Sequence, residues 1–302
     1  MAVSAFGNHT SEKPRIIRSS DQMRNFVRNQ QADGNRVGVV PTMGALHAGH
    51  LSLVQASTDQ CDCTVVTIFI NPTQFGPGED FQKYPRTLES DLGVLSHYGV
   101  SALFVPEVEV MYPPGHATSI DVGQVSRLWE GARRPTHFQG VATVVMKLFQ
   151  IIPANCAFFG QKDYQQTLVI RRMVEDLNVP VQIVVCPIVR ESDGLALSSR
   201  NVYLSADQRR QALSLSRALR HGRDLFAGGE SDAKKIVSTM RRVIDEASGD
   251  IMPDYLILAD PLTLEESAEA NQETIALVAA QVGATRLIDN HVLSHPWLEP
   301  LV

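Results

Sequence analysis

The sequence predicts an α/β fold, with a Rossmann-like parallel sheet in its larger first part and a smaller α+β domain after it. Up to about residue 188, short apolar runs alternate with longer stretches of helical spacing. Strand–helix–strand repeats of this kind form parallel sheets with right-handed crossovers. The apolar runs are continuous, as in strands covered on both faces. We expect a mobile N-terminal tail at 1–14, a larger parallel-sheet domain at 15–188 and a smaller C-terminal domain at 189–302.

The first domain is predicted to contain several strands, each followed by a helix. The expected strands lie at 36–41, 64–70, 101–106, 156–160 and 181–189. One helix is expected to pass through residues 51–55, and a second is expected from 87 to a stop at the glycine at 99. Two more are expected at 141–152 and 163–177. These assignments place the turns that follow each strand as the positions to search for ligand contacts, because ligands of parallel sheets lie beyond the carboxyl ends of the strands.

The second domain has a different pattern. Ser205 opens a long helix with Gln208 three residues later, which is the spacing of a capping box. A second helix is expected at 231–247, followed by strands at 255–260 and 274–282. Helices followed by strands in this order predict an α+β arrangement.

Composition narrows the class of protein. The 302 residues are 44% hydrophobic and 20% charged, which is typical of a globular chain. The net charge of −6 argues against a nucleic-acid partner, and no apolar run reaches the roughly 18 residues that would cross a membrane. The first residues do not form a secretory signal, so we expect a cytoplasmic protein whose four cysteines are buried thiols.

The strongest functional signal follows the strand at 36–41. There PTMGALHAGH places His47 and His50 in a strand-to-helix turn, with Gly44 and Gly49 beside them. Small residues let a phosphate approach the backbone, the helix start favours anions, and imidazoles add donors. We interpret this turn as a phosphate site. Two surface histidines and a pair of metal ligands are the alternatives, although no Glu or Cys lies nearby in sequence to complete a metal set.

The same segment resembles the H-x-G-H signature of the nucleotidylyltransferase superfamily. Members carry a second phosphate-binding motif late in the nucleotide domain, and LALSSRN (195–201) occupies the corresponding place. Its hydroxyls and the planar guanidinium of Arg200 suit phosphate oxygens. Taken alone, S-S-R-N would be a turn with a surface arginine in most proteins.

Three further segments narrow the resemblance. They are FINPTQFGPGEDFQKYPRTLESDL (69–92), RRPTHFQGVATVVMKLFQII (133–152) and FFGQKDYQQTLVIRRM (158–173). Together with the first motif they are similar to the pantothenate synthetase (pantoate–β-alanine ligase) family, from about residue 36 to 201 and more loosely to the C-terminus. Several independent motifs in the right order are far more specific than H-x-G-H by itself.

The resemblance implies a set of site residues. The implied ATP contacts are Met43, Gly44, His47, His50, Gly160, Lys162, Asp163, Val189, Leu197, Ser198, Ser199 and Arg200. Within this set the resemblance implies catalytic roles for four residues, with His50 as the proton donor beside His47, Lys162 and Arg200. Gln74 and Gln166 are implied as pantoate contacts, with β-alanine near Gln74. Lys162 has a simpler alternative as a surface lysine at a helix start.

The sequence departs from the family pattern in places. Gln161 stands where members commonly have Glu, Leu197 replaces Met, and the acidic stretch of Glu89 and Asp91 is thinner. Metal ligands are therefore left unassigned, with Mg²⁺ expected to be held mainly by ATP oxygens and water.

The reaction implied by the resemblance has two steps. The carboxylate of pantoate attacks the α-phosphorus of ATP, and the amine of β-alanine then attacks the pantoyl adenylate. The C-terminal domain is expected to act as a lid, and the family implies a homodimer. The alternatives are a nucleotide transferase of the same superfamily, an ATP-binding protein without catalysis, and a tRNA-charging fragment, which the acidic composition disfavours.

Overall fold

The structure is a computed structural model that describes residues 13–76, 78–79, 81–247 and 249–297. Apart from its last two residues, the tail expected at 1–14 lies outside the described residues. The chain forms two compact units. The first unit contains the described residues through Gly160 together with Val169–Cys186, and the second contains Gln161–Leu168 and Pro187 onward.

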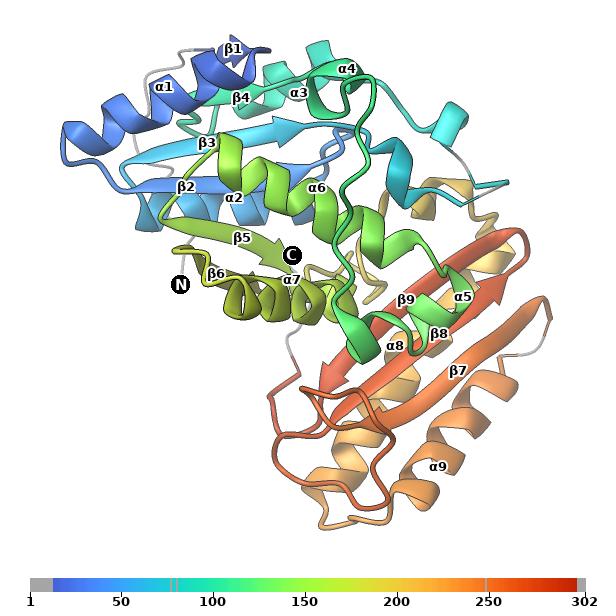
Figure 1. Ribbon diagram of the computed structural model, residues 1–302. Coiled ribbons are helices and arrows are strands. Elements are labelled where there is room, and N and C mark those ends of the chain that lie inside the picture. The colour runs from blue at the N-terminus through green and yellow to red at the C-terminus, as the bar shows by residue number, and fades with distance from the viewer. Residues whose placement is uncertain (1–12, 77, 80, 248, 298–302) are drawn as a thin grey trace, which may run out of the picture. The chain divides into compact units, whose positions relative to one another are not determined.

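A parallel sheet forms the centre of the first unit, as the sequence predicts, and it has six strands because Arg15–Ile17 adds one that was not expected (Figure 1). Its strands are β1 (Arg15–Ile17), β2 (Val37–Thr42), β3 (Cys63–Ile68), β4 (Ala102–Phe104), β5 (Cys156–Gly160) and β6 (Gln182–Cys186). All five neighbouring pairs are parallel, in the order β1-β4-β3-β2-β5-β6. The direction of the winding changes between β2 and β5, which is where ligands bind in open sheets of this kind.

Helices cover both faces of this sheet. They are α1 (Ser20–Ala32), α2 (Ala48–Gln60), α3 (Leu88–Leu95), α4 (Val108–Met111), α5 (Glu130–Arg133), α6 (His137–Ile151) and α7 (Tyr164–Asp176), whose first five residues belong to the second unit. Short 3-10 helices add η1 (Pro72–Gln74), η2 (Phe81–Lys83), η3 (Gly123–Ser126) and η4 (Gln161–Asp163), the last of these in the second unit.

Side chains alternate between two buried layers along the strands. Val39 and Val65 pack in one layer with α1 and α6, whereas Val40 and Val66 pack in the other with α2 and α3. Both layers are apolar, which explains why the strands appear as continuous hydrophobic runs in the sequence. The alternation fixes the register, because a shift of one residue would exchange the two layers.

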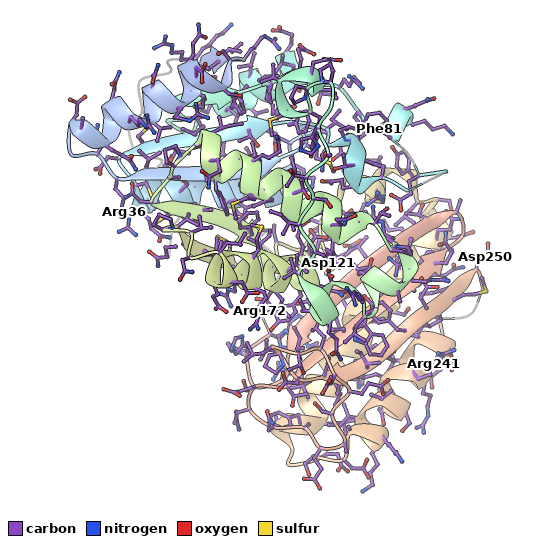
Figure 2. All side chains as sticks on the ribbon, in the orientation of Figure 1. Arg36, Phe81, Asp121, Arg172, Arg241 and Asp250 are labelled. Carbon is purple, nitrogen blue, oxygen red and sulfur yellow. The ribbon has the colours of Figure 1, made fainter. Side chains whose placement is uncertain are left out.

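The two ends of the parallel strands differ in chemistry. Arg36, at the amino ends, donates to Cys156 Sγ at 2.9 Å and to Gln182 Oε1 at 2.8 Å. Phe81 belongs to the chain that follows the carboxyl end of β3, and Figure 2 shows Arg36 and Phe81 at opposite ends of the sheet.

All four cysteines are buried and free, as expected, and burial raises the pKa of the Cys61 thiol to about 12. The thiols are therefore structural.

The second unit is an α+β arrangement. Its antiparallel sheet contains β7 (Ile251–Ala259), β8 (Ile275–Val282) and β9 (Thr285–Val292) in that order. The long helices α8 (Ala206–Ala227) and α9 (Ala233–Asp245) pack against it through an apolar cluster that includes Leu219, Ile236 and Val278, and η5 (Ser199–Tyr203) precedes α8. Ser205 and Gln208 form the predicted capping box at the start of α8.

Residues 161–168 group with the second unit, although the sequence places the boundary at 188/189. Tyr164 explains part of this, because its hydroxyl donates to Pro261 O at 3.0 Å. Among the described residues, no helix is long and apolar enough to cross a membrane.

Candidate active site

The turn after β2 has an unusual backbone. Gly44 and Ala45 both have positive φ, of 83° and 51°. The Gly44 N–H donates to Thr42 Oγ1 at 3.1 Å, and Thr42 Oγ1 in turn donates to Thr67 O at 2.6 Å. A Cβ at position 44 would lie 3.2 Å from the carboxylate of Asp91, so both the φ value and the space favour glycine here.

Asp91 occupies two amides of this turn. Its carboxylate accepts from the N–H groups of Ala45 at 3.1 Å and Leu46 at 2.9 Å, and from Thr87 Oγ1 at 3.1 Å. Asp91 is only 3% exposed. The sequence predicts that the backbone of this turn faces a phosphate, whereas in the structure these two amides bind an anion that belongs to the chain. These two amides are therefore occupied, and of the groups predicted to face a phosphate the histidine side chains and the first turn of α2 lie beyond them in the chain.

His47 and His50 lie together at the start of α2. Their rings are stacked with centroids 4.0 Å apart and planes 30° apart. His47 is the N-cap of the helix, and its backbone N–H donates to His50 Nδ1 at 3.4 Å. The Nδ1 edge of the His50 ring therefore faces the backbone at the start of the helix.

Gln74 lies at the end of η1, which follows β3. Its amide Nε2 donates to Met43 Sδ at 3.0 Å. The structure therefore joins a residue predicted to bind pantoate with a residue predicted to bind ATP, across the carboxyl ends of the neighbouring strands β2 and β3. These contacts depend on residues far apart in sequence.

Asn71 fixes the conformation of η1. It is 1% exposed, and its Oδ1 accepts from the Thr73 N–H at 3.3 Å and the Tyr112 hydroxyl at 2.8 Å. Its Nδ2 donates to Gly140 O at 3.1 Å in helix α6 and to Gln74 Oε1 at 3.2 Å. This buried amide therefore contacts the side chain of Gln74 and fixes the turn that carries it.

Arg134 and His137 hold the backbone of Gln74. His137 Nδ1 donates to Gln74 O at 2.9 Å, while its Nε2 accepts from Arg134 at 3.1 Å. Arg134 also binds both carboxylate oxygens of Glu79, at 2.8 and 2.7 Å. The guanidinium lowers the pKa of Glu79, chiefly through these hydrogen bonds. Sequence reasoning gave Asn71, Arg134 and His137 no role, although all three lie in the quoted family segments.

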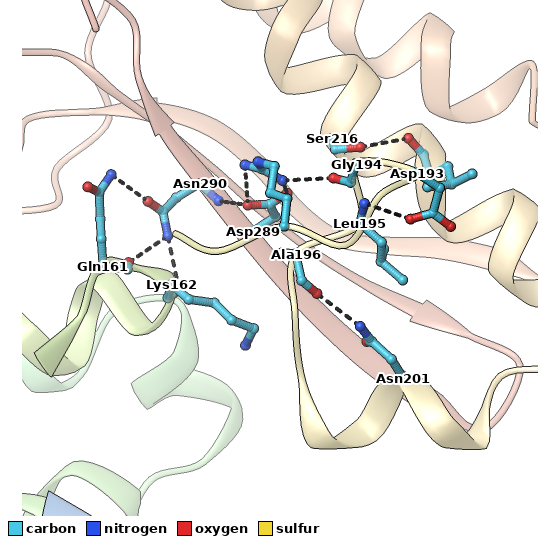
Figure 3. A network of polar contacts seen from close by, with 12 residues as sticks. Gln161, Lys162, Asp193, Gly194, Leu195, Ala196, Asn201, Ser216, Asp289 and Asn290 are labelled. Carbon is cyan, nitrogen blue, oxygen red and sulfur yellow. Dashed lines mark hydrogen bonds and ion pairs between the residues drawn. The ribbon is translucent and has the colours of Figure 1, made fainter. Parts of the chain in front are cut away.

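The remaining predicted contacts belong to the second unit, except Gly160, which ends β5. Lys162 and Asp163 lie in η4, with Nζ and Oδ1 3.8 Å apart, and Gln166 lies in the first turn of α7. Asn290, on β9, donates from Nδ2 to the carbonyls of Gln161 and Lys162, both at 3.0 Å (Figure 3).

A hairpin formed by residues 189–197 leads into the other residues of the second unit that are predicted to bind ATP. The Leu197 N–H donates to Val189 O at 3.0 Å, so these two predicted residues are neighbours. Ser198 follows directly, and its Oγ accepts from the Arg200 N–H at 3.3 Å. The Ser198–Arg200 segment therefore begins at the open end of the hairpin. Ser199 is the first residue of η5.

The described residues do not form the side-chain groupings that bind metal ions. Within residues 13–76, 78–79, 81–247 and 249–297, no three His, Cys, Asp or Glu side chains gather in a group that could hold a metal ion. Asp91, the buried member of the acidic stretch, accepts three hydrogen bonds from the chain itself.

Comparison with known proteins places these residues in a family. A family model described as pantoate-beta-alanine ligase matches residues 15–292. The chain belongs to the pantoate–β-alanine ligase family. The resemblance noted in the sequence is thereby confirmed across nearly the whole length of the chain.

Relatives and solved structures of the ligase family agree. The pantothenate synthetase of Koribacter versatilis (strain Ellin345) is 52% identical over 279 residues, covering 92% of this chain and 96% of the relative. The crystal structure of pantothenate synthetase from Thermus thermophilus matches with a TM-score of 0.87 and 45% identity, covering 92% of this chain and 99% of that one. A pantoate-beta-alanine ligase from Francisella tularensis, complexed with beta-gamma ATP and beta-alanine, matches with a TM-score of 0.75 and 32% identity over 94% and 99% of the two chains.

Proposed function

We propose that this chain joins (R)-pantoate to β-alanine at the expense of ATP. In the first step a pantoate carboxylate oxygen bonds to the α-phosphorus and the bond to the β-phosphate oxygen breaks, releasing pyrophosphate. In the second step the amine of β-alanine bonds to the acyl carbon, the acyl–oxygen bond breaks, and AMP leaves as the amine loses its proton. Membership of the ligase family and the ligands of the Francisella relative support this reaction.

The observation that carries the proposal is the contact between Gln74 and Met43. The first of these is the proposed pantoate contact and the second lines the proposed ATP turn. A carboxylate held by the Gln74 amide would lie beside the phosphates without being neutralised, because an amide carries no charge. This juxtaposition is what nucleophilic attack on the α-phosphorus requires.

The cationic and polar donors have a common role. His50 would donate to oxygens of the α-phosphate and leaving pyrophosphate as charge develops there. Lys162 and Arg200, with His47, Ser198 and Ser199, would stabilise the remaining phosphate charge. Gly44, Gly160, Asp163, Val189 and Leu197 would line the nucleotide through backbone and side-chain contacts. Gln166 would bind pantoate as a second neutral amide.

The remaining features of the proposal concern the setting of the reaction. ATP would arrive with Mg²⁺ held by phosphate oxygens and water, which is the coordination that this ion prefers. We also propose a cytoplasmic homodimer that needs no nucleic acid and no membrane.

The proposal is tested by pyrophosphate–ATP exchange in the presence of pantoate. His50→Ala is expected to lower the exchange rate by about 100-fold, as loss of one oxyanion donor does in other enzymes, with an unchanged circular dichroism spectrum. His97→Ala, which changes an exposed histidine in the first unit, is the matched control. Exchange at the wild-type rate in His50→Ala would refute the assignment.

A second assay separates this ligase from a nucleotide transferase. AMP release from ATP and pantoate is expected to rise steeply when β-alanine is added, because the amine discharges the adenylate. A transferase would form its product without any amine. AMP release that does not depend on β-alanine would therefore refute the ligase reaction.

A further inference from the structure

The second unit contains a buried polar network that contacts both of its segments proposed to bind ATP. Asn290 is its central residue, 2% exposed on β9. Its two amide hydrogens go to the successive carbonyls of Gln161 and Lys162, and its Oδ1 accepts from Gln161 Nε2 at 3.3 Å. Both hydrogens of the Asn290 N–H₂ group are therefore donated to η4, the turn that contains Lys162.

The network continues from Asn290 to the hairpin. The backbone N–H of Asn290 donates to Asp289 Oδ1 at 2.8 Å. Asp289 makes a two-armed ion pair with Arg190, at 2.7 and 3.0 Å, and both side chains are at most 5% exposed. Arg190 also donates to Gly194 O at 3.2 Å and stacks on Trp297 at 4.4 Å. Figure 3 shows the part of this network that runs from Gln161 and Lys162 through Asn290 to Asp289.

The hairpin connects Arg190 to the segment that contains Ser198, Ser199 and Arg200. Arg190 forms a bridge with Ala196, two residues before Ser198. Asn201 then closes the segment, since its Nδ2 donates to Ala196 O at 3.0 Å and to Glu191 Oε1 at 2.6 Å. The residues proposed to bind phosphate thus start from a backbone that is held on both sides.

We propose that Asn290 is a positioning residue that locks the Lys162 turn to the Val189–Arg200 hairpin through Asp289 and Arg190. This inference rests on the proposed function. Lys162 has a long flexible side chain, so its charge can act at one place only if its backbone is fixed. Asn290 fixes that backbone through two carbonyls, and the buried ion pair fixes Asn290 relative to the hairpin. The two ATP-binding segments of the second unit therefore keep one mutual geometry.

Asn290 can be tested more cleanly than the ion pair. Removing one partner of a buried pair leaves an uncompensated charge and threatens the fold. Asn290→Asp keeps the shape but replaces the N–H₂ group, which donates to two carbonyls, by one oxygen that cannot donate as a carboxylate. Asn290→Ser avoids placing a charge in the interior and serves as the second variant if the first does not fold. Leu287→Ala, a buried apolar change on the same strand, is the matched control for loss of sheet stability.

The decisive measurement is a double-mutant cycle with Lys162→Ala. In the otherwise wild-type chain, the Asn290 variants are expected to lower kcat for pantoate- and β-alanine-dependent AMP formation by up to about 100-fold, as a misplaced catalytic group does. In the Lys162→Ala background the same changes should cost less than about 3-fold, because the group that they misplace is already absent. Leu287→Ala should change kcat equally in both backgrounds.

Hydrogen exchange supplies an independent readout. Protection of the 161–168 peptide is expected to fall in the Asn290 variants and to stay at the wild-type level in Leu287→Ala. Equal losses of kcat in both backgrounds, or unchanged protection of that peptide, would overturn the role of Asn290 alone. A wild-type chain that forms no AMP with pantoate and β-alanine would refute the proposed function, and this inference with it.

Discussion

The close approach of η1 to helix α6 provides a sharp test of how Gln74 is positioned. A Cβ built on Gly140 would lie 2.5 Å from Thr73 O and 2.7 Å from Gln74 N, about 1 Å inside ordinary contact. Both atoms belong to backbone that Asn71 fixes, so a side chain cannot simply turn away. Gly140→Ala must therefore move the η1 backbone, and with it Gln74, by roughly that distance.

The magnitude follows from two opposing effects. Overpacking of this kind costs about 1–3 kcal/mol, whereas alanine is favoured over glycine in a helix interior by about 1 kcal/mol. We therefore expect Gly140→Ala to destabilise the fold by no more than about 2 kcal/mol. The effect on activity should be larger, because a displacement of about 1 Å can cost about 100-fold in rate.

The assay is kcat/KM for pantoate, measured as AMP formation at saturating ATP and β-alanine, together with thermal unfolding. Gly93→Ala is the matched control, because it lies in α3 and a Cβ there meets nothing within 4 Å. This control should keep wild-type activity and gain about 0.5–1 kcal/mol of stability. Wild-type kcat/KM in Gly140→Ala would show that the position of η1 does not govern the use of pantoate, and the reasoning would be wrong.

Two further predictions concern buried titratable groups. Asp91→Asn replaces one carboxylate oxygen that accepts amide hydrogens by an N–H₂ group, which donates. We expect a loss of about 2 kcal/mol in the free energy of unfolding and a raised KM for ATP. Glu89→Gln, an exposed change in the same helix, should alter neither quantity. An unchanged KM for ATP in Asp91→Asn would show that this carboxylate does not shape the turn. Burial lowers the pKa of His291 below its ordinary value of 6.5. Below about pH 6.5 the unfolded chain therefore binds a proton that the folded chain does not bind, so the free energy of unfolding should decrease as the pH is lowered. His291→Gln should flatten the acid side of the melting-temperature profile, and an unaltered profile would contradict this assignment.

The parallel sheet and the first motif could be predicted because their signals are local. The strand before His47 is apolar on both faces and is followed by glycines and a helix, so the strand-to-helix turn is readable from one stretch of chain. The strand expected at 181–189 ends earlier in the structure, at Cys186, before Pro187, which has no N–H to offer a ladder. The sequence-based boundary was wrong there for a local reason.

Strand β9 was missed for a reason that matters to function. Its last buried positions are Asp289, Asn290 and His291, so the hydrophobic signal of a strand disappears where the network begins. Helix α1 was also missed, because it buries only Met23 and Val27 and its apolar stripe is narrow. Polar residues in the interior weaken sequence patterns, and here they mark the part of the second unit that organises the proposed site.

The contact partners of the site residues required the fold. Asp91 lies 46 residues from Ala45, and Arg134 lies 60 residues from Gln74. No periodicity relates such positions, because they meet only when α3 and α6 pack against the sheet. The identities of the predicted residues thus came from motifs, whereas the groups that orient them came from tertiary structure.

The buried, weakly acidic cysteines have a practical consequence. A thiol reacts with alkylating reagents as the thiolate, and burial keeps Cys61, Cys63 and Cys186 protonated because it raises the pKa of each. The native chain should therefore stay unlabelled by maleimide dyes at neutral pH. One cysteine introduced on the surface of either unit would therefore accept a dye without background from the buried thiols.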